Sequence, residues 1–119
     1  MSDHPIHRLD DDVHQRVRLG VLACLAGVKR ADFAFLRTEL GLTDGNLGRH
    51  LEVLDAARLI SVTKDTGDGR PRTWIKITRA GREALRREVE ALQQILAAMP
   101  QGRDDEQPSD NTARTPTAF

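Results

Sequence analysis

Apolar residues recur at steps of three and four positions in four stretches of this chain, and this spacing predicts amphipathic helices. The first covers residues 11–25, where a run of aspartates suits the electropositive end of a helix. Gly27 is expected to end this helix in the left-handed conformation that glycine adopts easily. A second, shorter helix is expected over residues 32–40, with Asp32 as its N-cap.

Threonines precede the two remaining helices, and a threonine hydroxyl accepts a hydrogen bond from the free amides of a helix N-terminus. One helix follows Thr43, after a turn at Gly41, and the other spans residues 78–99 and stops at Pro100. The apolar stripe of the third helix is Leu47, Leu51 and Leu54. The last helix has a narrow seam of the coiled-coil type, Leu85, Val89, Leu92, Leu96 and Met99. Such a seam predicts a partner helix, so we expect dimerisation there.

Between the third and last helices, the apolar period changes to the two-residue period of half-buried strands. The alternating positions are Ile60 and Val62 on the first strand and Ile75 and Ile77 on the second. Residues 65–72 separate the strands and are rich in glycine, proline and aspartate, which favour turns. The pattern predicts a β-hairpin. Trp74 falls on the face opposite Ile75, and we expect it to pack on a neighbouring element or on a dimer partner.

A local motif accompanies this order of elements. Residues 42–51 have the sequence LTDGNLGRHL, which resembles the T-x-G-N-L-x-x-H-L signature of small winged-helix regulators close to the MarR and ArsR families. Supporting matches are His14, Arg18 and Leu19, residues 70–73 and residues 78–81. The resemblance covers residues 9–97. It implies an α+β winged helix-turn-helix fold with a three-helix core, a two-stranded β wing and a long C-terminal dimerisation helix.

The resemblance further implies a DNA-binding homodimer that regulates transcription, often as a repressor. Its third helix would enter the major groove of double-stranded DNA, and its wing would reach the backbone or the minor groove. A two-fold dimer would bind a roughly palindromic operator with half-sites about one helical turn apart. Two positions depart from the family pattern. Gly48 stands where a polar residue such as serine is commoner, and Arg58 stands where the turn after this helix commonly has glycine.

Short polar groups at the start of the third helix would let its backbone approach base edges. The candidates for DNA binding are Thr43, Asp44, Asn46 and Arg49 in this helix and Lys64, Arg70 and Arg72 in the wing. Arg49 lies off the leucine stripe, and either a bidentate contact with guanine or a phosphate contact is open to it. Thr43 and Asn46 could instead serve only the helix N-terminus. Pro71 is expected to stiffen the hairpin and hold its two neighbouring arginines outward.

The charge balance depends on which part of the chain is counted. The whole chain of 119 residues has a formal net charge of zero, which by itself argues against a nucleic-acid partner. Residues 13–99, however, hold 15 basic and 10 acidic residues, and an excess of this kind suits phosphates. We expect a flexible N-terminus over residues 1–8, one winged-helix domain over residues 9–99, and a disordered acidic tail over residues 100–119.

No apolar run approaches the roughly 18 residues that span a bilayer, so we expect a cytoplasmic protein without a membrane segment. Cys24 is the single cysteine, which excludes an internal disulfide. We expect no enzymatic activity and no cofactor, because no nucleophile and base are placed together by spacing. Whether a small-molecule effector controls the protein is open.

Two other functions have some features of the sequence in their favour. A metal sensor of the ArsR type would draw its ligands from His4, His7, His14, Cys24 and His50, whose spacing does not support a site within one chain. Only an oligomeric site that uses His4 and His7 stays open. His50 is better interpreted as a partly buried histidine that links helices, because it lies close to the leucine stripe. A winged-helix module that binds only proteins stays open, since the zero net charge and the acidic ends favour it.

Overall fold

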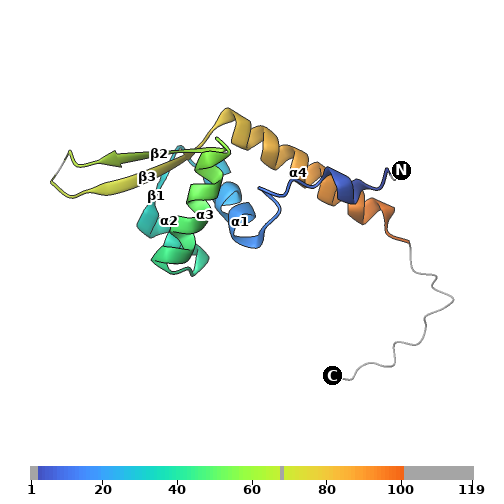
Figure 1. Cartoon of the computed structure of the whole chain (residues 1–119), viewed down its shortest axis with the longest axis horizontal. Helices are drawn as coiled ribbons and strands as arrows, with labels where there is room; N and C mark the ends of the chain where they lie inside the picture. The colour runs from blue at the N-terminus through green and yellow to red at the C-terminus, as the bar shows by residue number, and fades with distance from the viewer. Residues whose placement is uncertain (1–2, 68, 101–119) are drawn as a thin grey trace, which may run out of the picture.

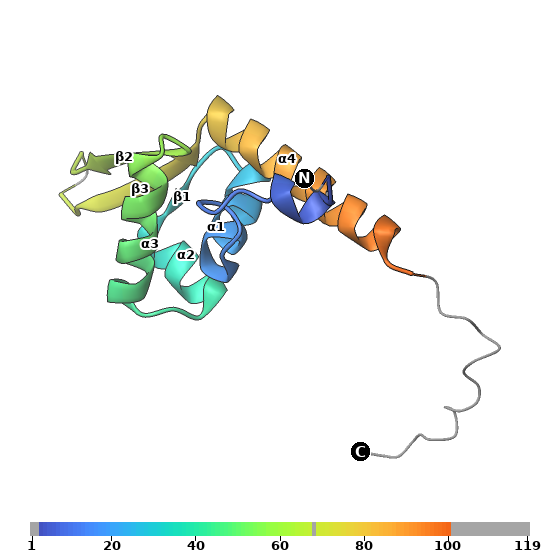
Figure 2. The same ribbon diagram turned by 45° about the vertical axis from the view of Figure 1, so that its right-hand side comes forward.

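The computed structural model of the chain describes residues 3–67 and 69–100, and from residue 101 on the predicted tail lies outside this range. The short helices form a central group, from which a hairpin and a long helix extend in opposite directions (Figures 1 and 2). The elements are η1 (Pro5–Arg8), α1 (Arg16–Ala26), β1 (Ala31–Asp32), α2 (Phe33–Leu40), α3 (Asp44–Ala56), β2 (Ile60–Asp65), β3 (Arg72–Ile77) and α4 (Arg79–Ala98). The expected winged helix-turn-helix fold is confirmed.

One apolar core joins the short helices to the root of the hairpin. Its fully buried side chains are Val13, Val21, Leu22, Leu25, Leu36, Leu47, Leu54 and Ile75. Full burial of a side chain of this size contributes about 1.5–3 kcal/mol relative to leaving it in water. Because α1, α2 and α3 all contribute to this cluster, none of them can rotate without exposing a leucine.

The sheet contains a third strand that the periodicity did not predict. β1 pairs antiparallel with β3, which gives the strand order β1-β3-β2, and it sets Ala31 opposite Ile75. β2 and β3 pair from Ile60 opposite Ile77 at the root to Asp65 opposite Arg72 near the turn. The expected two-stranded wing is confirmed as the β2–β3 hairpin, and β1 adds a third strand to its sheet. A strand of two residues is too short to display an alternating pattern.

Beyond its root, the hairpin is more exposed than its pattern suggests. Ile60 is 2% exposed whereas Val62 is 38% exposed, so the half-buried face predicted for β2 is limited to its first residue. Ile75 and Ile77 of β3 are buried as predicted. Val62 lies opposite Ile75, so the two differ in exposure because β2 is an edge strand of the sheet, whereas β3 lies between β1 and β2.

α1 begins later than the aspartate run predicts. Residues 11–13 form a separate turn, in which the Asp10 carboxylate accepts a hydrogen bond from the Asp12 amide at 2.9 Å. Gln15 is the actual N-cap of α1, and its side chain accepts from the Arg18 amide at 3.0 Å. Aspartate side chains compete with the helix for nearby amides, so the run stabilises a turn before the helix instead of the helix itself.

Two residues have left-handed backbone conformations at the ends of helices. Gly41 closes α2 with φ 65°, and Arg58 follows α3 with φ 64°. This conformation costs a residue with a Cβ about 1–2 kcal/mol, which explains why glycine is commoner than arginine at the position of Arg58. Gly27 ends α1 with φ −95°, so the left-handed cap predicted there is wrong.

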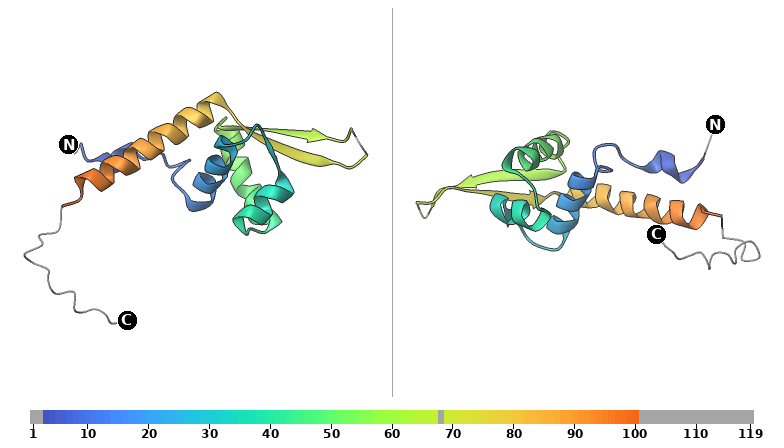
Figure 3. Two further views of the ribbon diagram at one scale, coloured as in Figure 1. Left: turned by 180° about the vertical axis from the view of Figure 1, so that it is seen from behind. Right: turned by 90° about the horizontal axis from the view of Figure 1, so that it is seen from below.

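The N-terminal segment lies along α4 where the structure describes it (Figure 3). The sequence suggested a flexible segment over residues 1–8, but η1 forms there, and the Arg8 guanidinium donates to the side chain of Gln94. The Asp10 amide donates to the Glu88 carboxylate at 3.0 Å. These partners lie far along the chain, which is why a short polar segment gave no sign of being ordered.

α4 has two adjoining faces. The face toward the rest of the chain carries buried, mostly small residues, namely Gly81, Ala84, Glu88 and Ala91. Beside it runs the predicted seam, in which Leu85 packs partly on the core, Leu92 is half-buried, and Val89 and Leu96 are 42% and 66% exposed. Within this chain the seam is therefore only partly covered.

Gly81 lies where α4 closely approaches the residue before β2, because a Cβ placed on Gly81 would lie 2.1 Å from the Leu59 carbonyl oxygen. We expect Gly81→Ala to lower the free energy of unfolding by about 1–3 kcal/mol, since neither backbone can move aside cheaply. Gly48→Ala is the matched control, because a Cβ there meets no described atom within 4 Å. It should raise the free energy of unfolding by about 0.5–1 kcal/mol, since alanine favours a helix more than glycine does. Urea unfolding measures both, and a Gly81→Ala protein as stable as the wild type would contradict this packing.

Candidate nucleic-acid interface

α3 is exposed on the side away from its leucine stripe, including its N-terminal half. Its leucine stripe faces the core, where Leu47 and Leu54 are fully buried and Leu51 is 6% exposed. Thr43 and Arg49, which lie off that stripe, are exposed. The core therefore determines which side of α3 is presented to a partner.

Thr43 serves the helix N-terminus. Its Oγ1 accepts a hydrogen bond from the Asn46 amide at 3.1 Å, so its predicted role as the N-cap of α3 is confirmed. A hydroxyl can donate while it accepts, so the Thr43 proton remains able to meet an anion. The side-chain oxygen of Asn46 is buried and has no hydrogen-bond partner within the described part of the chain. A contact from Asn46 to a ligand would have to come from its amide nitrogen.

The Asp44 carboxylate is held by an arginine that the sequence analysis missed. Arg37 of α2 donates to Asp44 Oδ1 at 2.7 Å. The pair offsets the acidic charge at the start of α3. It also brings the Arg37 guanidinium, in addition to that of Arg49, to the edge of the helix-turn-helix. No periodicity links the two residues. They meet because the left-handed turn at Gly41 brings the end of α2 back to the start of α3.

His50 joins α3 to α1. Arg18 Nη1 lies 3.1 Å from His50 Nδ1, and because a guanidinium only donates, Nδ1 is the acceptor and the ring is neutral. The same guanidinium donates to the carbonyl oxygens of Asp11 and Asp12, at 3.2 and 2.6 Å. Burial and, after it, the charges of Arg18 and Arg49 lower the pKa of His50. The predicted partly buried histidine that links helices is confirmed.

The wing carries its basic side chains on an exposed arm. Lys64, Arg70 and Arg72 are all exposed. Arg72 Nη1 lies 3.9 Å from Asp32 Oδ2, so this side chain leans back toward the start of α2 instead of being held fully outward by Pro71 as predicted. Asp32 is within reach because β1, the strand that the pattern missed, lies beside β3.

Trp74 packs against neighbouring side chains, as predicted. The guanidinium carbon of Arg30 lies 3.8 Å from the ring centroid and that of Arg72 lies 5.8 Å from it. Val28 and Phe35 line the same hollow and are 41% and 50% exposed. We call Val28, Phe35 and Trp74 the tryptophan patch. It is an apolar surface with basic residues at its rim.

A groove runs between α3 and the wing. Gly48 lies in its wall and leaves it more open than the commoner serine would, because glycine has no side chain to fill it. The lining also includes Glu52, Asp55 and Lys64. Carboxylates repel phosphates but accept hydrogen bonds from cytosine amino groups, so this part of α3 is suited to base edges more than to the backbone.

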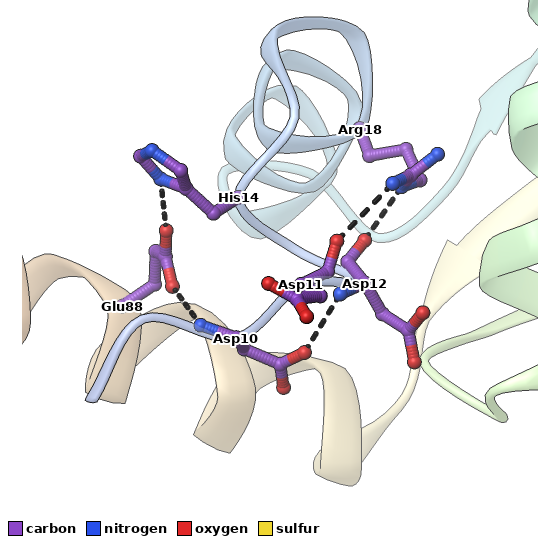
Figure 4. Close-up of polar contacts among 6 residues, drawn as sticks. All are labelled: Asp10, Asp11, Asp12, His14, Arg18 and Glu88. Carbon is purple, nitrogen blue, oxygen red and sulfur yellow. Dashed lines mark hydrogen bonds and ion pairs between the residues drawn. The ribbon is translucent and has the colours of Figure 1, made fainter. Parts of the chain in front are cut away.

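Glu88 is a buried carboxylate that the sequence analysis also missed. Its side chain is fully buried, His14 Nδ1 lies 2.5 Å from one carboxylate oxygen, and the Asp10 amide donates to the other at 3.0 Å (Figure 4). A signal was present, because Glu88 stands four residues after Ala84 and three before Ala91 on a stripe of small residues. That spacing places it on a packed face of the helix.

Within residues 3–67 and 69–100, no three histidine, cysteine, aspartate or glutamate side chains are grouped to hold a metal ion. His14 and His50 are engaged by Glu88 and Arg18, and burial, with a contribution from Glu39, raises the pKa of the Cys24 thiol. No helix in this described part is long and apolar enough to cross a membrane.

A helix-turn-helix that presents the N-terminal end of α3 beside a basic wing defines the winged-helix class of DNA-binding transcription regulators. The family model of the winged helix DNA-binding domain matches residues 17–96, and the chain belongs to this family. An uncharacterized protein of Methanocaldococcus jannaschii is 38% identical over 79 residues, which is 66% of this chain and 86% of that relative.

Solved structures of transcription regulators have the same fold. A transcriptional regulator homologue from Pyrococcus horikoshii OT3 is 29% identical, with a TM-score of 0.77 over 82% of this chain and 98% of that one. A MarR family regulator from Streptomyces coelicolor, solved in complex with DNA, is 22% identical, with a TM-score of 0.60 over 87% of this chain and 69% of that one. The second likeness concerns the fold alone.

The lowered pKa of His50 predicts a pH dependence of stability. The unfolded chain binds a proton as the pH falls below 6.5, the ordinary histidine value, before the folded chain does. This contribution to stability is therefore complete above that value and is lost as the pH falls toward the lowered pKa of the folded state. His50→Asn keeps an acceptor for Arg18 but does not titrate. Its melting temperature should fall less between about pH 7.5 and about pH 5.5 than that of the wild type. If the melting temperatures of the two proteins, measured by circular dichroism, fell equally, His50 would make no such contribution to stability.

Proposed function

We propose that the chain acts as a homodimer that binds a specific, roughly palindromic operator in duplex DNA and represses transcription by occupying it. The proposal rests above all on the exposed N-terminal half of α3, which a shared core holds beside a basic wing. In this arrangement α3 enters the major groove and the wing lies over the adjacent backbone or minor groove. The DNA complex of the Streptomyces coelicolor regulator, which has the same fold, supports this geometry.

α3 combines base contacts with backbone contacts in this proposal. Arg49 reads a base, because it is exposed and its planar guanidinium matches the acceptor pair of guanine. The Thr43 hydroxyl and the first amides of α3 bind a phosphate. Asn46 contributes its amide nitrogen. Asp44 acts mainly through Arg37, which it holds near the neighbouring phosphates.

The wing supplies attraction that does not depend on sequence. Lys64, Arg70 and Arg72 lie on the exposed arm and suit phosphate oxygens. Arg72 has to leave Asp32 to reach DNA, but a half-exposed pair separated by 3.9 Å contributes at most about 1 kcal/mol. Exchange of this pair for a phosphate is therefore favourable.

The seam on α4 is the proposed dimer interface. Val89 and Leu96 expose 42% and 66% of their surface, and both lie in line with Leu85 and Leu92. A second copy of α4 would cover this stripe in the way helices pair in coiled coils. The two-fold axis of such a dimer relates the two α3 helices, which is the source of the palindromic operator.

The tryptophan patch favours a second candidate function, a winged helix that binds a protein. Its exposed Phe35 and Val28 form an apolar surface of the kind found at interfaces. Selection of duplexes from a random pool, followed by a salt series, separates the two functions. A DNA-binding regulator yields a palindromic consensus and loses affinity steeply as salt rises. Absence of binding to any duplex at low salt would overturn the regulator proposal.

Leu92→Glu tests the dimer interface. A charge in the middle of an apolar seam should convert the dimer to a monomer and lower operator affinity by at least about tenfold, because the two half-sites are no longer bound together. Arg87→Glu is the matched control, since it places the same side chain on an exposed side of α4 away from the seam. Sedimentation and DNA titration measure the outcome. A Leu92→Glu dimer with unchanged affinity would exclude this interface.

Paired alanine variants separate base readout from backbone contact. Arg49→Ala should relax sequence preference at one position of each half-site, with a loss of about 1–3 kcal/mol on the preferred operator. Arg72→Ala should weaken binding by a similar factor on every sequence and reduce the slope of affinity against salt by about one per protomer. Titrations on the operator and on unrelated duplexes measure both. Losses from Arg72→Ala that depend on sequence would reverse the two roles.

A further inference from the structure

The contact between Glu88 and the N-terminal segment fixes α4 in two directions. One oxygen of the fully buried carboxylate is 2.5 Å from His14 Nδ1 and the other is 3.0 Å from the Asp10 amide (Figure 4). A rotation of α4 about its axis, or a slide along it, would separate at least one of these pairs. A leucine at this position would pack against the same neighbours but would tolerate both movements.

The buried position of Glu88 makes this contact directional. A carboxylate loses its hydration when it is buried, so it is stable only where protein donors replace the water. The residues of α4 on the same face, Ala84 and Ala91, are small and apolar and offer it no other donor. The Glu88 carboxylate therefore finds both of its hydrogen-bond donors in only one arrangement of α4 against the N-terminal segment. Apolar contacts alone could form in several arrangements.

The same N-terminal segment is tied to α3 at its other end. Arg18 donates to the carbonyl oxygens of Asp11 and Asp12 and to His50 Nδ1 of α3 (Figure 4 shows the two carbonyl contacts). A continuous set of hydrogen bonds thus runs from α4, through the turn at residues 10–14, to the helix that we assign to the major groove. Movement of α4 relative to the turn would change the position of α3 relative to α4.

We propose that Glu88 is a positioning residue for operator recognition, which sets the spacing of the two α3 helices in the dimer. The inference rests on the proposed function, because α4 carries the dimer seam and α3 meets the DNA. Glu88 holds α4 at one angle to the DNA-binding unit, and the two-fold axis doubles any change in that angle. The dimer therefore accepts half-sites at one separation.

The separation of the half-sites in DNA can be changed in steps of one base pair, which tests how strictly the dimer fixes the separation of its two α3 helices. One added base pair moves a half-site by about 3.4 Å along the helix axis and rotates it by about 35°. A rigid dimer cannot follow both changes at once. A dimer with a loosened α4 can follow them by rotating or sliding α4 on the N-terminal segment.

The experiment measures affinity of the full chain for the selected palindrome with one base pair added to or removed from its centre. The wild type should lose at least about tenfold in affinity for each altered spacing, whereas folded, dimeric Glu88→Leu should lose less than about threefold. Glu88→Gln should keep the wild-type profile, because an amide can accept from Asp10 and donate to His14. Glu83→Leu, the same change at an exposed position of α4, is the matched control and should also keep it.

A second variant covers the case in which Glu88→Leu does not fold. His14→Leu breaks the contact from its more exposed side, where the histidine side chain is 45% exposed, and should flatten the spacing profile in the same way. Folded, dimeric Glu88→Leu or His14→Leu proteins with the sharp wild-type profile would overturn the inference alone. A wild type that binds one protomer per duplex, or binds all spacings equally, would overturn the proposed palindromic binding and the inference with it.

Discussion

The burial of one leucine cluster between α1, α2 and α3 is the constraint on which the rest of the molecule depends. The helices are short, and an isolated helix of such length is marginal in water, so their stability comes from the shared core. That core fixes the rotation of α3. Once Leu47, Leu51 and Leu54 face inward, Arg49 faces outward because it lies off their stripe.

Apolar packing and polar contacts have different roles in joining α4 to this unit. At its start, α4 touches the hairpin root so closely that Gly81 leaves no room for a side chain. Farther along, Glu88 makes two hydrogen bonds to the N-terminal segment. The close packing at Gly81 fixes a point, and the hydrogen bonds of Glu88 fix an angle. A long helix whose position and angle are both fixed is suited to hold the two DNA-binding units of the proposed dimer at a constant separation.

The electrostatics show why the net charge of a chain is a poor guide to its partners. α3 itself is not basic, since Arg49 stands among Asp44, Glu52 and Asp55. One of these carboxylates is offset by Arg37, which comes from another helix. Further basic groups suited to phosphates are on the wing, which extends beyond the helices (Figure 1). In the proposed complex, the wing makes only sequence-independent contacts, whereas α3 makes contacts of both kinds.

The amino-acid sequence by itself determined the order of the four α-helices and the hairpin, the caps at Asp32, Thr43 and Thr78, and the buried stripe of α3. These features depend on residues within a few positions of one another, so local spacing is sufficient to predict them. The roles of the candidate DNA-binding residues, including Arg49 and Arg72, stay predictions, because the sequence gives their positions and the structure gives their surroundings, but neither contains the DNA.

Only the tertiary structure decided the third strand, the late start of α1, the lean of Arg72 toward Asp32, and the contacts of Glu88 and Arg37. Each is a competition between partners that are distant in the chain or that satisfy the same hydrogen-bonding group in two ways. The aspartates before α1 could cap a helix or close a turn with equal local chemistry. The turn forms where Asp10 is also held by Glu88, a residue that no local pattern connects to it.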